Sequence, residues 1–191
     1  HELIKKICKN KVFENIFVST GATFNREIKK TAEILKNSEK DYALLHCVSI
    51  YPTPIDNAHL SRMNYLRRFS NVVGYSDHSN PELYGNIIPA TAIYVGAQVI
   101  EKHFTIIDKK ETKDGVVSVN ENQLKELVNL KNISRLELKK YIDENIKDYR
   151  TLLGLESRDL SDEELLNRDY YQGRFVTKKE QNHIFNWEKF N

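Results

Sequence analysis

The sequence predicts an α/β protein built on a parallel sheet. Over about the first 130 of the 191 residues, apolar strand-like runs alternate with amphipathic helical stretches. The connections between them are short, and this alternating order specifies parallel strands. Each apolar run also ends in a polar cluster. The pattern fits either a doubly wound sheet or half of an eight-stranded barrel, and periodicity does not choose between them.

Four strands are expected. The second run, Tyr42–Ser49, is almost continuously apolar, as in a parallel strand covered on both faces. It ends before Pro52 and Pro54, which lack the N–H that regular pairing needs. The other apolar runs are Val12–Ser19, Asn71–Tyr75 and Ala97–Phe104. Strand cores are therefore predicted near residues 14–19, 42–48, 72–75 and 98–103.

The helices follow the strands. We expect Asn25–Lys36 to be helical with Asn25 as its N-cap, and Pro81 to occupy the first turn of a helix over Pro81–Val95. The other predicted helices are the opening residues, Leu60–Phe69, Glu121–Lys131 and, after a break, Ser134–Lys147. Tyr170–Asn191 has no clear period.

Composition excludes several classes of partner. Lys and Arg number 29 against 27 Asp and Glu, a net charge of +2 with the two signs interleaved, so nucleic acid is not an expected partner. No apolar run approaches the ~18 residues of a membrane span, and the opening residues lack the apolar region of a signal peptide. Cys8 and Cys47 do not make a disulfide framework, which favours a cytoplasmic location.

The polar clusters predict a site at one edge of the sheet, because active sites of parallel sheets lie at the carboxyl ends of the strands. His78 and His103 follow neighbouring strands and either share a metal ion or each bond a loop backbone. Their common edge favours the metal. His46 lies mid-strand among leucines, so we expect a core histidine. Asp77 either orients His78 or caps the helix at Pro81.

Small hydroxyl groups also lie at this edge. They suit an anion such as phosphate, or they cap the helices that follow. These residues are Ser19, Thr20, Ser49 and Ser76, and Gly21 allows a close approach of the backbone. Cys47 and Met63 are expected in the core.

Four motifs in this order resemble the N-acetylneuraminate (sialic acid) synthase family, which includes the legionaminic and pseudaminic acid synthases. They are STGA (19–22), LLHCVSIYPTP (44–54), VGYSDHS (73–79) and GAQVIEKHFT (96–105). The resemblance implies the second half of a (β/α)8 TIM barrel, with four parallel βα units and a C-terminal helical extension. The implied domains are the half-barrel at 1–132, a helical linker at 133–167, and a degenerate or truncated start of an antifreeze-like domain at 168–191.

The resemblance also implies a site. His78 and His103 would hold Mn²⁺ or Mg²⁺, and Ser19 and Ser76 would contact phosphoenolpyruvate. Ser49 and Tyr51 would line the same pocket. Asp114 would contact the acceptor sugar and, with the two histidines, make the catalytic set. Gly115 stands where the family commonly has a histidine, which leaves the identity of the aldose open.

The implied reaction condenses phosphoenolpyruvate with an N-acylated aldose, N-acetylmannosamine or a related sugar, to a nonulosonic acid with release of phosphate. The expected partner is a second copy in a homodimer, or an upstream half of the barrel. Two alternatives remain: a metal-dependent barrel hydrolase, and an inactive or split half-barrel that needs an upstream partner.

We predict that these 191 residues alone show little or no synthase activity, because the family's catalytic Lys and Glu have no counterpart here. Loss of one catalytic group typically lowers the rate by about 10² to 10⁴. The measurement is phosphate release from phosphoenolpyruvate with N-acetylmannosamine and Mn²⁺, with and without an added upstream half. Robust turnover by the chain alone would contradict the prediction.

Overall fold

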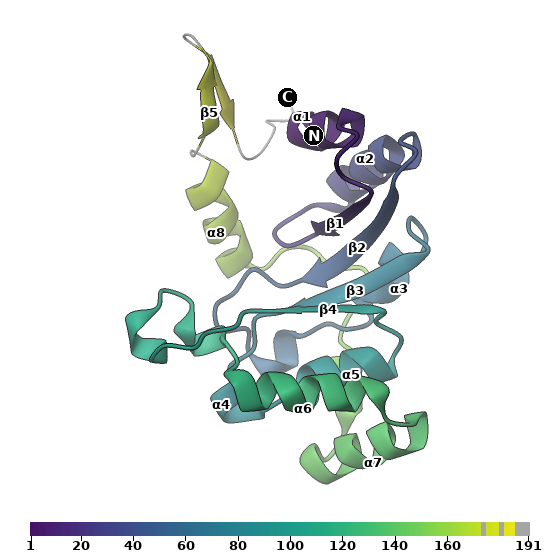
Figure 1. The fold of residues 1–191 in the computed structure, drawn as a ribbon, viewed down its shortest axis with the longest axis vertical. Helices are drawn as coiled ribbons and strands as arrows, with labels where there is room; N and C mark the ends of the chain where they lie inside the picture. The colour runs from purple at the N-terminus through teal and green to yellow at the C-terminus, as the bar shows by residue number, and fades with distance from the viewer. Residues whose placement is uncertain (173–174, 180–181, 186–191) are drawn as a thin grey trace. The chain divides into compact units, whose positions relative to one another are not determined.

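The computed structural model describes residues 1–172, 175–179 and 182–185 (Figure 1). Its first four strands form one sheet in the order β1-β2-β3-β4, and both β2–β3 and β3–β4 pair in parallel. The strands are β1 (Asn15–Ser19), β2 (Asp41–Cys47), β3 (Val72–Asp77) and β4 (Val99–Lys102). The predicted α/β class with four strands in sequence order is confirmed.

Helices separate the strands and continue after them. The helices are α1 (Glu2–Lys9), α2 (Asn25–Lys36), α3 (Arg62–Leu66), α4 (Pro81–Tyr84), α5 (Ile87–Tyr94), α6 (Glu121–Asn132), α7 (Arg135–Asn145) and α8 (Asp162–Gln172). Short 3-10 turns are η1 (Ile55–Asn57), η2 (Lys109–Glu111), η3 (Gly115–Val117) and η4 (Tyr149–Leu152). In the part of the chain that the structure describes, no helix is long and apolar enough to span a membrane.

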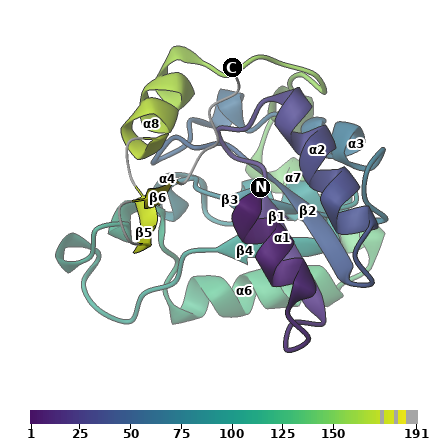
Figure 2. The same ribbon diagram turned by 90° about the horizontal axis from the view of Figure 1, so that it is seen from above.

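The chain forms two compact units. The first comprises residues 1–16, 22–41 and 159–191, and the second comprises 17–21 and 42–158. In the second unit, α5 packs against β3, and α6 and α7 pack against α5 (Figures 1 and 2). Its core includes Leu44, Val73, Tyr75 and Ile88, each at most 1% exposed. The predicted domain boundaries at 132 and 167 stay predictions.

The first unit contains a buried ion pair. Arg168 of α8 donates to both carboxylate oxygens of Glu27, at 3.0 and 2.6 Å, and to the carbonyl of Ala22 at 2.7 Å. The Arg168 guanidinium also lies 4.7 Å from the centroid of the Phe24 ring. Glu27 in turn accepts the Phe24 N–H at 2.8 Å. The pair therefore attaches α8 to the first turn of α2.

Two local predictions were wrong. The N-cap of α2 is Phe24, one residue before the predicted Asn25. The predicted helix Pro81–Val95 is two helices, because the chain breaks at Gly85, whose φ of +53° is a left-handed conformation that favours glycine. The C-terminal region without period contains an antiparallel pair, β5 (Phe175–Lys179) and β6 (Asn182–Phe185). Parts of the predicted antifreeze-like segment at 168–191 lie outside the described residues.

His46 is a core histidine, as predicted. Its side chain is 1% exposed, and its Nε2 lies 2.8 Å from the carbonyl oxygen of Ala58. Burial lowers the pKa of His46 to about 3. The residue is therefore neutral in the folded protein throughout the range in which an exposed histidine gains its proton.

We expect the protein to lose stability below about pH 6.5, where the unfolded chain protonates His46 and the folded protein does not. The loss from this group is up to about 1.4 kcal/mol per pH unit until the pH approaches the folded-state pKa. Urea unfolding between pH 7 and 4 measures it. His46→Gln should flatten the slope, while His59→Asn, at a half-buried histidine with a φ of +46°, should keep it. Equal slopes in the two variants would contradict the prediction.

Candidate active site at the carboxyl edge of the sheet

The register of the parallel strands aligns the candidate residues in two rows. Cys47 pairs with Ser76, and Ser76 pairs with Glu101, so these three positions form one row across β2, β3 and β4. Two residues further along each strand direction come Ser49, His78 and His103. Because side chains alternate between faces, both rows lie on the same side of the sheet.

Residues of the loop that follows β2 contact both nitrogens of the His78 ring. The side chain is 3% exposed, its Nδ1 lies 3.1 Å from the carbonyl oxygen of Val48, and its Nε2 lies 3.0 Å from the hydroxyl of Tyr51. A carbonyl can only accept, so Nδ1 carries the proton and Nε2 accepts from Tyr51. Burial lowers the pKa of His78, which keeps the ring neutral. A neutral imidazole with one nitrogen fixed by a carbonyl is the form that binds metals.

His103 lies beside His78. The ring centroids are 5.2 Å apart, and the ring of Tyr51 contacts both, at 4.1 Å from His78 and 6.0 Å from His103. The Nδ1 of His103 is 3.9 Å from a carboxylate oxygen of Asp114. The fold thus brings together four of the predicted residues, His78, His103, Tyr51 and Asp114.

The predicted hydroxyl groups differ in their surroundings. Ser76 is 1% exposed and donates to the carboxylate of Glu101. Ser19 is exposed at the end of β1, and Ser49 is half-buried beside Gly21, where an added Cβ would collide with the Ser49 hydroxyl. Thr20 has a structural role, because its hydroxyl donates to the carbonyl of Leu45 at 2.9 Å.

Glu101 was missing from the predicted site. It aligns with Ser76 in the register, and its carboxylate accepts the Ser76 hydroxyl. The signal was present in the sequence, because Glu101 precedes His103 by two positions and so shares its face of the strand. The arrangement adds a carboxylate to the two imidazoles and the serine hydroxyl.

The Asp77 carboxylate bonds neither the His78 ring nor the first turn of the helix at Pro81. The carboxylate accepts from Lys102 Nζ at 2.7 Å and from the backbone N–H and hydroxyl of Ser79. The helix at Pro81 is capped instead by Asn80, whose side chain accepts the N–H of Glu82. Asp77 therefore lies on the opposite face of β3 from His78, as strand alternation requires.

Asp114 lies in a tightly folded loop. The Ser118 hydroxyl donates to the Asp114 carbonyl at 2.8 Å, and the next residue, Gly115, is buried. A Cβ at Gly115 would overlap the carbonyl of Lys109 and come within 2.6 Å of the Thr112 hydroxyl. The path of the loop therefore leaves no space for any side chain at position 115.

Two imidazoles are a partial ligand set for a divalent metal ion. In the described part of the chain, no group of three or more His, Cys, Asp or Glu side chains converges to hold a metal. His78 and His103 suit Mn²⁺ as nitrogen ligands, and Mg²⁺ ordinarily retains several waters or substrate oxygens. The residues therefore fit an ion that takes most of its ligands from substrate and solvent.

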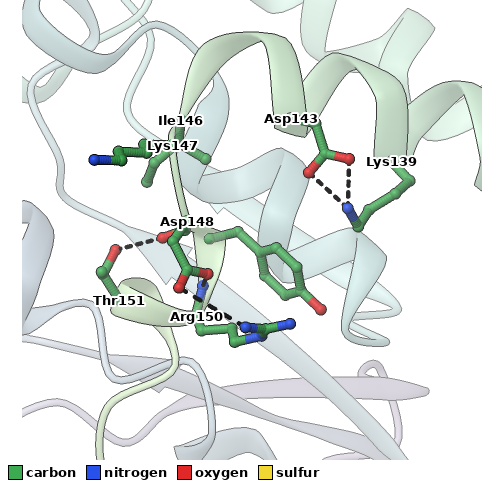
Figure 3. A pocket seen from close by; sticks show the side chains of 8 residues that line it. Lys139, Asp143, Ile146, Lys147, Asp148, Arg150 and Thr151 are labelled. Atoms are coloured by element: carbon green, nitrogen blue, oxygen red, sulfur yellow. Dashed lines mark hydrogen bonds and ion pairs between the residues drawn. The ribbon is translucent and has the colours of Figure 1, made fainter.

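A surface pocket of about 550 Å³ lies away from this edge (Figure 3). Four of the five charged side chains that line it are paired with one another. Lys139 bonds Asp143, Arg150 lies 4.0 Å from Asp148, and Thr151 donates to the Asp148 carbonyl. None of the predicted site residues lines this pocket, so we do not assign it to the chemistry.

Comparison with known proteins gives a consistent set of relatives. Residues 1–141 match the NeuB family. The N,N'-diacetyllegionaminic acid synthase of Legionella pneumophila is 31% identical over 182 residues, which cover 86% of this chain and 46% of that protein. The pseudaminic acid synthase of Campylobacter jejuni is 30% identical over 177 residues, covering 92% and 46%. The chain spans less than half the length of these relatives.

Solved structures share the fold. The spore coat polysaccharide biosynthesis protein SpsE of Bacillus subtilis superposes with a TM-score of 0.72 at 26% identity, over 89% of this chain and 46% of that chain. The N-acetylneuraminic acid synthetase of Leptospira borgpetersenii, in complex with citrate, gives a TM-score of 0.62 at 26% identity, over 90% and 53%.

We predict that His78 is the tautomer protonated at Nδ1, because the Val48 carbonyl requires a donor. Imidazole ¹⁵N spectra at neutral pH distinguish the two ring nitrogens. Tyr51→Phe should leave the tautomer unchanged, since this substitution removes only the hydroxyl that bonds Nε2. A proton on Nε2 in either protein would show that the assignment is wrong.

Proposed function

The chain belongs to the NeuB family, and from this premise we propose that it is the metal- and phosphoenolpyruvate-binding half of a nonulosonic acid synthase. The single observation that carries the proposal is the pair of adjacent imidazoles, His78 and His103, with ring centroids 5.2 Å apart at the carboxyl edge of the sheet. Ser76 and Glu101 lie in the neighbouring row on the same face. The names of the relatives support a synthase of the sialic, legionaminic or pseudaminic acid type.

In the proposed reaction, C3 of phosphoenolpyruvate forms a bond to the aldehyde carbon of an open-chain N-acylated aldose. Water then adds at C2, and the C–O bond to phosphate breaks, giving inorganic phosphate and the keto acid. A bound Mn²⁺ or Mg²⁺ supplies Lewis-acid polarisation of the aldehyde oxygen. His78 and His103 would hold this ion. Because Nδ1 of His78 bonds Val48, the ion would bind Nε2 in place of the Tyr51 hydroxyl.

The other residues of the proposed site position the substrates. Ser19, Ser49 and Ser76 would orient the phosphate and carboxylate of phosphoenolpyruvate, a contribution that lies mainly in geometry. Asp114 would bond hydroxyl groups of the aldose, near enough to His103 that the aldehyde end of the sugar approaches both imidazoles. Gly115 leaves no side chain beside Asp114, which favours an acceptor other than the one that the family's histidine accommodates.

We propose further that the face of the sheet that carries these side chains is the interior of a (β/α)8 barrel. Phe17 of β1 shares this face and is 60% exposed, an unusual position for a large apolar side chain in mid-strand. An upstream half of the barrel would cover it and supply the remaining catalytic groups. The assembled protein would be a cytoplasmic homodimer.

The test is phosphate release by the chain combined with an upstream half taken from a relative. We expect release only when phosphoenolpyruvate, an aldose and Mn²⁺ are all present. His78→Gln and His103→Gln should each reduce the rate at least about 10²-fold. His59→Asn, which keeps an acceptor for the Leu155 N–H, is the matched histidine control and should retain activity.

Phosphate release from phosphoenolpyruvate alone would indicate a hydrolase and contradict the proposal. Equal rates in the His78 and His59 variants would also contradict it.

A further inference from the structure

A buried ion pair lies on the opposite face of the sheet, directly behind the two histidines. Asp77 and Lys102 immediately precede His78 and His103 in the sequence. Their side chains are 0% and 2% exposed, and the Lys102 Nζ lies 2.7 Å from a carboxylate oxygen of Asp77. Charged side chains are almost never fully buried unless they are paired, so this arrangement requires both partners.

The pair closes a ring of hydrogen bonds across two strands and a loop. Lys102 donates both to Asp77 and to the carbonyl of Ser79, at 2.8 Å. Asp77 accepts the Ser79 N–H at 3.0 Å and the Ser79 hydroxyl at 2.9 Å. β4 is thereby attached both to the end of β3 and to the loop that follows it.

The ion pair also joins the last paired residues of β3 and β4. β3 ends at Asp77 and β4 ends at Lys102, and these two residues are register partners. One residue further on, the two backbones bond different segments. The carbonyl of His78 accepts the Thr53 N–H at 2.9 Å, and the carbonyl of His103 accepts the Val119 N–H at 2.8 Å. The lateral spacing of the histidines is therefore fixed by the residues just before them.

From this geometry we infer that Asp77 and Lys102 are positioning residues, which hold the two strand ends together so that the His78 and His103 imidazoles meet. The part of the inference that concerns metal binding rests on the proposed function. The part that concerns the spacing of the two rings rests on the structure alone. A partner that orients a metal ligand typically changes metal affinity by about 10- to 100-fold when it is removed. The effect here is transmitted through the backbone of the strand ends.

A purely stabilising ion pair would behave differently. Removal of one partner leaves a buried charge without compensation and destabilises the protein whatever the pair does for the site. The informative variant therefore removes both charges. In Asp77→Asn/Lys102→Met, the amide oxygen still accepts the Ser79 N–H and no charge is buried, but the bond between the strands is lost.

The experiment compares this double variant with the wild-type 191-residue chain by three measurements. They are the melting temperature, the nuclear Overhauser effect between the His78 and His103 ring protons, and the Mn²⁺ affinity by electron paramagnetic resonance. We expect a melting temperature close to that of the wild type, a weakened ring-to-ring effect, and Mn²⁺ affinity lower by about 10- to 100-fold.

The buried ion pair of the other unit provides a matched control. Arg168→Met removes the partner of Glu27 and should lower the melting temperature while leaving the ring-to-ring effect and the Mn²⁺ affinity unchanged. Lys102→Gln, a milder change, is measured in the same way in case the double variant does not fold.

A wild-type ring-to-ring effect in a folded variant that lacks the Lys102 ammonium would overturn the inference. The same effect also separates the inference from the proposed function. If the wild-type chain does not bind Mn²⁺, the proposed function loses its metal, while the histidine spacing in the variants still decides whether Asp77 and Lys102 are positioning residues.

Discussion

The parallel register of β2, β3 and β4 is the constraint from which the arrangement of the site follows. Pairing of Cys47 with Ser76 and of Ser76 with Glu101 places these three side chains in one row, and the next positions on the same face are Ser49, His78 and His103. A slip of one residue would turn both imidazoles to the helix-covered side. The buried Asp77 and Lys102 would then face the candidate site. Only the observed register therefore places the imidazoles on one face and the buried ion pair on the other.

The loop after β2 fixes the orientation of the His78 side chain, which the register only places at the edge of the sheet. Val48 and Tyr51 contact opposite nitrogens of the His78 ring, and Thr53 bonds the His78 backbone. The imidazole is thus held at both nitrogens, and the backbone of the same residue is held at its carbonyl. Preorganisation of this kind would lower the reorganisation needed in the proposed reaction. The His103 ring has an edge contact with Tyr51 and lies 3.9 Å from the Asp114 carboxylate.

Much of the fold could be predicted from local pattern. The helix over Asn25–Lys36 was predicted with the bounds that α2 has, because its apolar period is regular. The region from Pro81 to Val95 was misjudged, because a single glycine in a long apolar run gives little indication of a left-handed break. The pairing of Asp77 with Lys102 depends on which strands are neighbours and in what register, and one sequence does not specify either. Glu101 could have been included in the predicted site, because strand alternation places it on the same face as His103.

The buried Gly115 limits how the loop around Asp114 can change over evolutionary time. Its backbone packs against Lys109, with no space for even a methyl group, so a histidine cannot arise there by a single codon change without displacement of the loop. A lineage with this loop would have to alter its length or its path first.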